Sequence, residues 1–144
     1  MNNHEGQRVV QWPTIEELTS RAPLPIGYRY TYLTKAEVPA LIDSLKTWYP
    51  GIAVGNASCH MRESFYIEKV YLGESTDRDF LVTLFKFDNE LAAVFSVERD
   101  VDSQVVYGRI GALSPKHRGA NLSDHSYRWR RRLAAQWGWG WSTG

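Results

Sequence analysis

The sequence has little cysteine, almost no net charge and no long hydrophobic run. Its single cysteine, Cys59, excludes an intramolecular disulfide and fits a reducing compartment. The formal charge of +1 gives no global attraction to nucleic acid or to an anionic membrane. No stretch approaches the roughly 20 apolar residues of a membrane-spanning helix. The polar residues 1–8 also lack the apolar centre of a signal peptide. We therefore expect a cytoplasmic protein with no membrane segment.

Several familiar catalytic motifs are missing as well. The four histidines are scattered, and no pair has the spacing of metal ligands, so we expect no metal site. The sequence contains neither a Gly-Lys-Ser/Thr phosphate loop nor a Gly-x-Ser-x-Gly nucleophile turn. Cys59 has only His60 beside it as a base, which favours an incidental or buried thiol over a nucleophile.

What is present indicates a single folded domain of mixed α and β structure. The chain has 144 residues, of which 43% are hydrophobic and 13% aromatic, and this composition excludes bulk disorder. Thr14 and Glu17 have the spacing of a helix capping box, and aromatic residues alternate over 28–33 as in a strand. A second capping pair, Thr34 and Glu37, predicts a helix over 34–48, with a kink or a later start at Pro39.

The second half of the chain predicts an antiparallel meander. Apolar strands over 80–87, 91–98 and 104–113 are joined by short polar turns. Between the N-terminal helix and the meander, residues 51–64 read as a loop, and 65–72 fit either a strand or the end of a helix.

The order of residues over 105–123 indicates a possible binding function, and not only packing. An apolar strand ends at Leu113-Ser114-Pro115, a basic turn with Arg118-Gly119 follows, and a helix begins. A strand, a tight turn and a helix N-terminus in this order can aim several backbone N–H groups at one anion, which the helix dipole also favours.

The order of these elements resembles the GNAT superfamily of N-acetyltransferases, from about Tyr28 to Ser123. The resemblance is most specific at 105–123, where Arg118-Gly119 matches the family's Arg-Gly pair in the turn that holds the pyrophosphate of acetyl-coenzyme A. Asn121 stands where the family has Gly, and Ser123 where it has Gly or Ala. Asn tolerates a left-handed backbone and Ser is small, so the turn can survive both changes.

The resemblance implies an α+β fold, the N-terminal part of an acyl-CoA N-acyltransferase, with acetyl-CoA as co-substrate and a small-molecule or peptide amine as acceptor. It implies that the donor is bound by nine residues: Gly111, Ala112, Leu113, Arg118, Gly119, Ala120, Asn121, Leu122 and Ser123. A backbone N–H among the first three would polarise the thioester carbonyl.

Other side chains have weaker assignments. Glu98, at the end of a strand, is the candidate base for the amine, against the simpler interpretation of a solvated charge facing Arg99 or Arg109. His117 is either a phosphate contact or an exposed turn residue. The acceptor pocket is not readable, and the aromatic or apolar side chains near the first helix fit a core as well as a pocket: Tyr49, Met61, Phe65 and Tyr66.

The end of the chain departs from the family. We expect no room for the fifth strand and the later elements after the last helix, and so a catalytically impaired, truncated domain. Alternating Trp and Gly over 137–141 suits neither a helix nor a packed terminus, and reading one base earlier gives Met-Gly-Met-Gly-Leu. We therefore divide the chain into an extension (1–27), a partial acyltransferase domain (28–123) and a tail (124–144) with a frameshift as the hypothesis for its origin. The exposed sheet edge predicts a marginal monomer or a homo-oligomer.

Two other classes of function remain open. An arginine cluster interleaved with aromatic residues could bind nucleic acid or an acidic partner, although a solvated helix face is the simpler explanation at a net charge of +1. The cluster comprises Arg128, Arg130, Arg131 and Arg132. The third class is an interaction fragment without a ligand.

Overall fold

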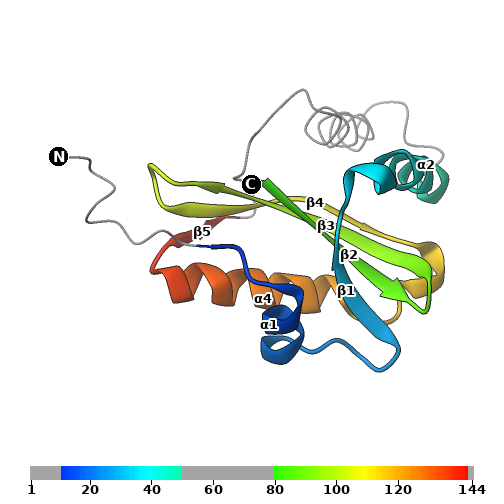
Figure 1. Cartoon of the computed structure of the whole chain (residues 1–144), viewed down its shortest axis with the longest axis horizontal. Coiled ribbons are helices and arrows are strands. Elements are labelled where there is room, and N and C mark those ends of the chain that lie inside the picture. Colours follow the sequence, from blue (N-terminus) through cyan, green and yellow to red (C-terminus); the bar gives the residue numbers. More distant parts are fainter. Residues whose placement is uncertain (1–10, 50–79, 143–144) are drawn as a thin grey trace.

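A mostly antiparallel sheet with helices on both faces organises the molecule (Figure 1). The structure, a computed structural model, describes residues 11–49 and 80–142. The described strands lie in the order β1-β2-β3-β4-β5, so neighbours in the sequence are neighbours in the sheet. In Figure 1, α2 lies on one side of this sheet, and α1 and α4 lie on the other.

The N-terminal elements form where their capping residues predict them. Helix α1, Ile15–Arg21, begins with a complete capping box between Thr14 and Glu17. Strand β1, Tyr28–Tyr32, follows. A short 3-10 turn, η2 (Lys35–Glu37), precedes helix α2 (Val38–Trp48), so the α-helix starts late, with Pro39 in its first turn, where its missing N–H costs no hydrogen bond.

The predicted meander is confirmed. Strands β2 (Phe80–Phe87), β3 (Glu90–Asp100) and β4 (Val105–Leu113) pair antiparallel in sequence. The turns between them place Asp88 at φ 54° and Gln104 at φ 55°, left-handed conformations that tight hairpin turns require.

Strand β4 contains a bulge that reverses which residues face which side. Phe95 pairs with Gly111 and Val97 with Gly108, so two residues of β4 oppose Ser96. Val106, before the bulge, belongs to the core under α1 and α4, whereas Ala112, after it, belongs to the core under α2. Bulges are over-represented beside active sites, because they re-aim a strand and end regular pairing.

The expectation of no fifth strand is wrong. Helix α4 (Leu122–Trp137) ends at Gly138, which has φ 73° and donates its N–H to the carbonyls of Ala134 and Ala135. Strand β5 (Gly140–Ser142) then pairs in parallel with the start of β4. The Trp-Gly alternation therefore has a structural explanation: Gly138 stops the helix in the left-handed conformation, and the tryptophans pack against the core.

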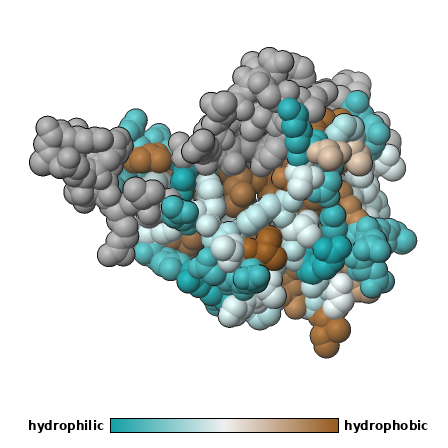
Figure 2. Space-filling model, in the orientation of Figure 1, coloured by the Kyte–Doolittle hydropathy of each residue, from teal (hydrophilic) through white to brown (hydrophobic). Residues whose placement is uncertain are grey.

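Two hydrophobic clusters hold the layers together. The larger lies between the sheet and the helices α1 and α4 and includes Phe85, Phe95 and Trp129. The smaller lies under α2 and includes Leu41, Val82 and Val94. Hydrophilic residues dominate the described surface in Figure 2, and hydrophobic ones appear there in small separate groups.

Some of the predictions concern residues outside the described part of the chain. They are those for the segments 51–64 and 65–72 and for Cys59 and His60. Residues 11–27, which we assigned to an N-terminal extension, include α1, whose Leu18 is buried in the larger cluster. Residues 124–142 pack as part of the same sheet and helix layers, through α4 and β5.

Candidate functional site

The edge of β4 opens after its first three residues. β5 pairs only with Val105, Val106 and Tyr107, and within the described part of the chain no strand pairs with residues 108–113 on that side. Ser114 donates its N–H to Ala92 on β3 at 2.8 Å, which fixes the orientation of the strand. In this antiparallel register the N–H groups of Gly111 and Leu113 point away from β3, toward the opening.

Tyr49, the residue after α2, reaches the top of this open edge. The Leu113 N–H donates a hydrogen bond to the Tyr49 hydroxyl at 3.3 Å. The guanidinium carbon of Arg118 lies 5.5 Å from the centre of the Tyr49 ring, within the range of a cation–π contact. Tyr49 therefore lies beside the edge of β4 that no described strand covers.

The turn between β4 and α4 is tight and held by its own backbone. His117 donates its N–H to the carbonyl of Ser114 at 2.9 Å, and Ala120 donates to the carbonyl of His117 at 3.3 Å. Asn121 has φ 56° and ψ 31°, the left-handed conformation that its position in the motif requires. A Cβ on Gly119 would meet nothing within 4 Å, so open space lies over this residue.

The N-terminus of α4 has no side-chain cap. The Asn121 side chain makes no capping hydrogen bond, and the Asn121 carbonyl accepts a hydrogen bond from the His125 N–H at 3.2 Å. Leu122 and Ser123 are the first two residues of the helix, so their N–H groups have no carbonyl acceptor within it. They are therefore available to donate hydrogen bonds to a ligand. These donors, the helix dipole and the open space at Gly119 together suit a phosphate group.

His117 is not an exposed turn residue, which was one of its two interpretations. It is 8% exposed, because the η5 turn (Pro115–His117) folds its ring over β1 and β2. The Tyr28 hydroxyl and His117 Nδ1 are 2.8 Å apart, and Nε2 lies 3.6 Å from a Glu90 carboxylate oxygen. His117 therefore anchors the turn to the sheet, with its side chain turned away from the open space at Gly119.

Glu98 lies on the opposite face from α4. It pairs with Tyr107 on β4 and Phe80 on β2, and it is half-buried. Its neighbour Val97 belongs to the core under α4, so Glu98 points to the face that α2 covers. Three residues separate it from Phe95, the partner of Gly111, or roughly 10 Å along the strand.

The arginine cluster is divided among different contacts. Arg128 forms an ion pair with Asp124 at 2.9 Å, and Arg131 lies over the Tyr127 ring at 5.4 Å. Arg132 donates to the carbonyl of Arg21 at 3.1 Å, at the end of α1. Arg130 points inward and is 9% exposed. The cluster is therefore not one continuous basic surface.

Sequence reasoning missed the role of Arg130. Its guanidinium carbon lies 5.3 Å from the Trp141 ring centre and 5.8 Å from that of Phe95, and burial lowers its pKa to about 10. A signal was present, because Leu122, Ser126 and Leu133 recur at helical spacing and mark the inner face of α4, on which Arg130 also falls.

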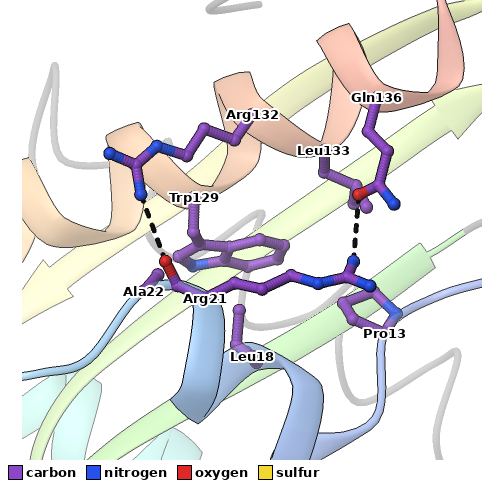
Figure 3. Close-up of a pocket in the computed structure, with 8 residues that line it drawn as sticks. All are labelled: Pro13, Leu18, Arg21, Ala22, Trp129, Arg132, Leu133 and Gln136. Atoms are coloured by element: carbon purple, nitrogen blue, oxygen red, sulfur yellow. Dashed lines mark hydrogen bonds between the residues drawn. The ribbon is translucent and has the colours of Figure 1, made fainter.

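A small pocket lies between α1 and α4 (Figure 3). Leu18, Trp129 and Leu133 form its apolar part, and Arg21 donates across it to Gln136 at 3.0 Å. Trp129 lies seven residues into α4, roughly 10 Å along the helix from Leu122. The pocket is therefore separate from the open space at Gly119.

In residues 11–49 and 80–142, no group of three or more His, Cys, Asp or Glu side chains is placed to hold a metal ion. None of the helices in these ranges is long and apolar enough to cross a membrane.

The comparisons with known proteins define the fold. No protein family model matches the sequence, and no curated protein sequence matches it either. Many solved structures match, and among them is the PaiA N-acetyltransferase of Thermoplasma acidophilum in complex with coenzyme A. That match has a TM-score of 0.57 and 14% identity over 78% of this chain and 75% of that one.

Two further matches are of the same kind. A predicted acetyltransferase of Clostridium acetobutylicum, solved with acetyl-CoA, has a TM-score of 0.55 and 10% identity over 80% of this chain and 79% of that one. An acetyltransferase of Salmonella typhimurium that modifies the N-terminal serine of a 50S ribosomal protein has a TM-score of 0.54 and 16% identity. It covers 83% of this chain and 70% of that one. The chain has the GNAT acyl-CoA N-acyltransferase fold, as the resemblance predicted.

Proposed function

We propose that the protein is an N-acetyltransferase that moves the acetyl group of acetyl-CoA to an amine. The observation that carries the proposal is the uncapped N-terminus of α4 directly after the open edge of β4, with Asn121 left-handed between them. The likeness to acetyltransferase structures supports it.

The residues of the turn would bind the pyrophosphate. In this proposal the backbone N–H groups of Gly119, Leu122 and Ser123 donate to phosphate oxygens, and the Arg118 guanidinium adds charge at the rim. Ala120 and Asn121 shape the turn, and Ala120 N–H is already bonded to the His117 carbonyl.

The open edge of β4 would bind the pantetheine arm as an added strand does, through the outward N–H groups of Gly111 and Leu113. Ala112 pairs with Val94 on β3 and supports this edge from the other side. Because the Leu113 N–H is bonded to the Tyr49 hydroxyl, donor binding at that position replaces this bond.

The proposed acetyl transfer uses groups on both faces of the sheet. The amine nitrogen attacks the thioester carbonyl carbon, a C–N bond forms, the C–S bond breaks, and the coenzyme A thiolate leaves and takes up a proton. In this proposal the Gly111 N–H donates to the oxyanion and stabilises it. Glu98, on the α2 face, receives the proton of the amine through water. The acceptor is then a small-molecule or peptide amine that approaches from the α2 face.

The acceptors named for the structural neighbours differ from one another, because they include a ribosomal protein, spermidine and aminoglycosides. They support an amine acceptor as a class and no particular compound.

Calorimetric titration with coenzyme A and acetyl-CoA tests the proposal. We expect both to bind the wild-type chain, and Gly119→Ala to weaken binding at least tenfold, because the methyl group fills the space over the helix N-terminus. Gly119 has no protein atom near its Cβ position, so the melting temperature of this variant should stay within 1–2 °C of wild type, about the effect of a few tenths of a kcal/mol.

Gly140→Ala is the matched control, since a Cβ there meets Val105 at an ordinary 3.5 Å. It should bind coenzyme A as the wild type does. If neither coenzyme A nor acetyl-CoA binds the wild-type chain, the proposed function is wrong.

A further inference from the structure

Arg130 is a buried cation for which the described residues supply no anion. It is 9% exposed, and no carboxylate in the described ranges lies within ion-pair distance of its guanidinium. Its hydrogen bond runs from Nε to the carbonyl of Ser126, one turn earlier in α4, at 3.2 Å. Burying a cation without an opposite charge is unfavourable, and a ligand that carries a carboxylate would supply that charge.

The guanidinium lies at the base of the opening between β4 and β5. A Cβ on Gly108 would come within 2.8 Å of Arg130 Nη1, so the guanidinium lies directly against this residue. Gly108 is the first residue of β4 beyond the last pair with β5, Tyr107 with Ser142. The Trp141 ring of β5 flanks the guanidinium from the other strand.

Two further polar groups in this neighbourhood lack partners among the described residues. The indole Nε1 of Trp141 and the Oγ of Ser126 are both buried without a hydrogen bond. Ser126 lies one helical turn before Arg130 on the same face of α4, and Trp141 packs over Arg130. Together they offer hydrogen-bond donors at one place with no acceptor to match them.

This place lies where the acyl end of the donor would point. In the proposed function, the Gly111 N–H meets the thioester carbonyl, and the donor runs along β4 from the turn at Gly119 toward the base of the opening. Gly108 lies three residues further along, but the bulge shortens this distance to that between Phe95 and Val97 on β3, roughly 7 Å. An acetyl methyl group ends well short of Arg130, whereas a four-carbon chain with a terminal carboxylate extends toward it.

We infer that Arg130, with Trp141 and Ser126, forms an anion subsite that selects an acyl-CoA whose acyl group ends in a carboxylate. Succinyl-CoA is the probe of this class. The inference rests on the proposed function and refines its donor: the chemistry stays a transfer of an acyl group to an amine, and Arg130 determines specificity without touching the reacting atoms.

The experiment is a calorimetric titration of the full chain with coenzyme A, acetyl-CoA and succinyl-CoA. We expect succinyl-CoA to bind at least tenfold more tightly than acetyl-CoA. Arg130→Met keeps the length of the side chain and removes the charge, so the two affinities should come within twofold, while coenzyme A binds unchanged. Arg132→Met, which removes a charge from the outer face of α4, should keep the tenfold preference.

Gly108→Ala gives a second variant, which changes no charge. Its Cβ displaces Nη1 of Arg130 from its position in the subsite. It should also reduce the preference, and it serves where Arg130→Met fails to fold. If coenzyme A and acetyl-CoA bind but succinyl-CoA binds no more tightly, the inference is overturned and the proposed function stands. If no coenzyme A species binds, both are wrong.

Discussion

At the scale of single residues, Asn121 decides whether the turn before α4 keeps its shape. Its φ of 56° is unfavourable for a side chain with a Cβ, and Asn tolerates it better than most residues. Because its side chain makes no capping hydrogen bond, replacing it changes the backbone preference without removing a cap.

We therefore expect Asn121→Ala to lower the free energy of unfolding by about 1 kcal/mol. Asn121→Gly should match or exceed wild type, since glycine adopts this conformation without strain. Urea denaturation followed by circular dichroism measures both. An Ala variant as stable as the Gly variant would show that the left-handed conformation is not maintained in solution.

Single residues also show what the sequence could and could not predict. The Thr14–Glu17 capping box and the left-handed Asn121 follow from local rules, and both are present. His117 and Arg130 were misjudged because their burial depends on which surface packs over them. His117 lies two residues after Pro115 in a basic turn, which favours an exposed position, and only the fold shows that the turn packs back onto Tyr28 and Phe87.

At the scale of elements, α2 is attached to the sheet by an ion pair at its start. Lys86 on β2 lies 2.8 Å from a carboxylate oxygen of Glu37. Partial burial acts to raise the pKa of Glu37, but hydrogen bonds from Lys86 and Thr34 outweigh it and hold the pKa below its usual 4.5. A lowered pKa in the folded state means that this contribution to stability is present above pH 4.5 and is lost as the pH falls below it.

We expect Lys86→Met to reduce the free energy of unfolding by about 1 kcal/mol or less at pH 7, because the pair is partly exposed. The difference from wild type should shrink as the pH falls from 5 to 3. Chemical denaturation at several pH values measures it. A difference that stays constant over this range would mean that the Glu37 carboxylate does not carry the effect.

The helices and strands also differ in how accurately the sequence predicts them. The strands of the meander have long apolar runs and short turns, so they were predicted within one or two residues. β5 spans Gly140–Ser142 and carries no strand pattern of its own. It forms because α4 returns the chain to the edge of β4 and because Trp139 and Trp141 pack against the core there, which are tertiary effects.

At the scale of the whole molecule, the sheet separates two faces with different roles in the proposed function. The α4 face carries the turn, the uncapped helix and Arg130, and the α2 face carries Glu98. The opening beside residues 108–113 is the place in the described sheet where the two faces meet, so a donor on one side and an amine on the other can react there. The order of elements predicted a site at the turn after β4, whereas the division of the proposed site between the two faces depends on the bulge in β4.

The same opening predicts how the molecule associates. Residues 108–113 form a strand edge without a partner strand in the described sheet, and such an edge can pair with a strand of a second copy. We therefore expect the apparent mass in size-exclusion chromatography with light scattering to rise with protein concentration. Coenzyme A should shift the protein back toward the monomer, because in the proposed function it occupies the same backbone N–H groups.

A mass that stays monomeric at all concentrations, with and without coenzyme A, would exclude pairing through this edge. A dimer that coenzyme A leaves unchanged would place the interface elsewhere on the molecule.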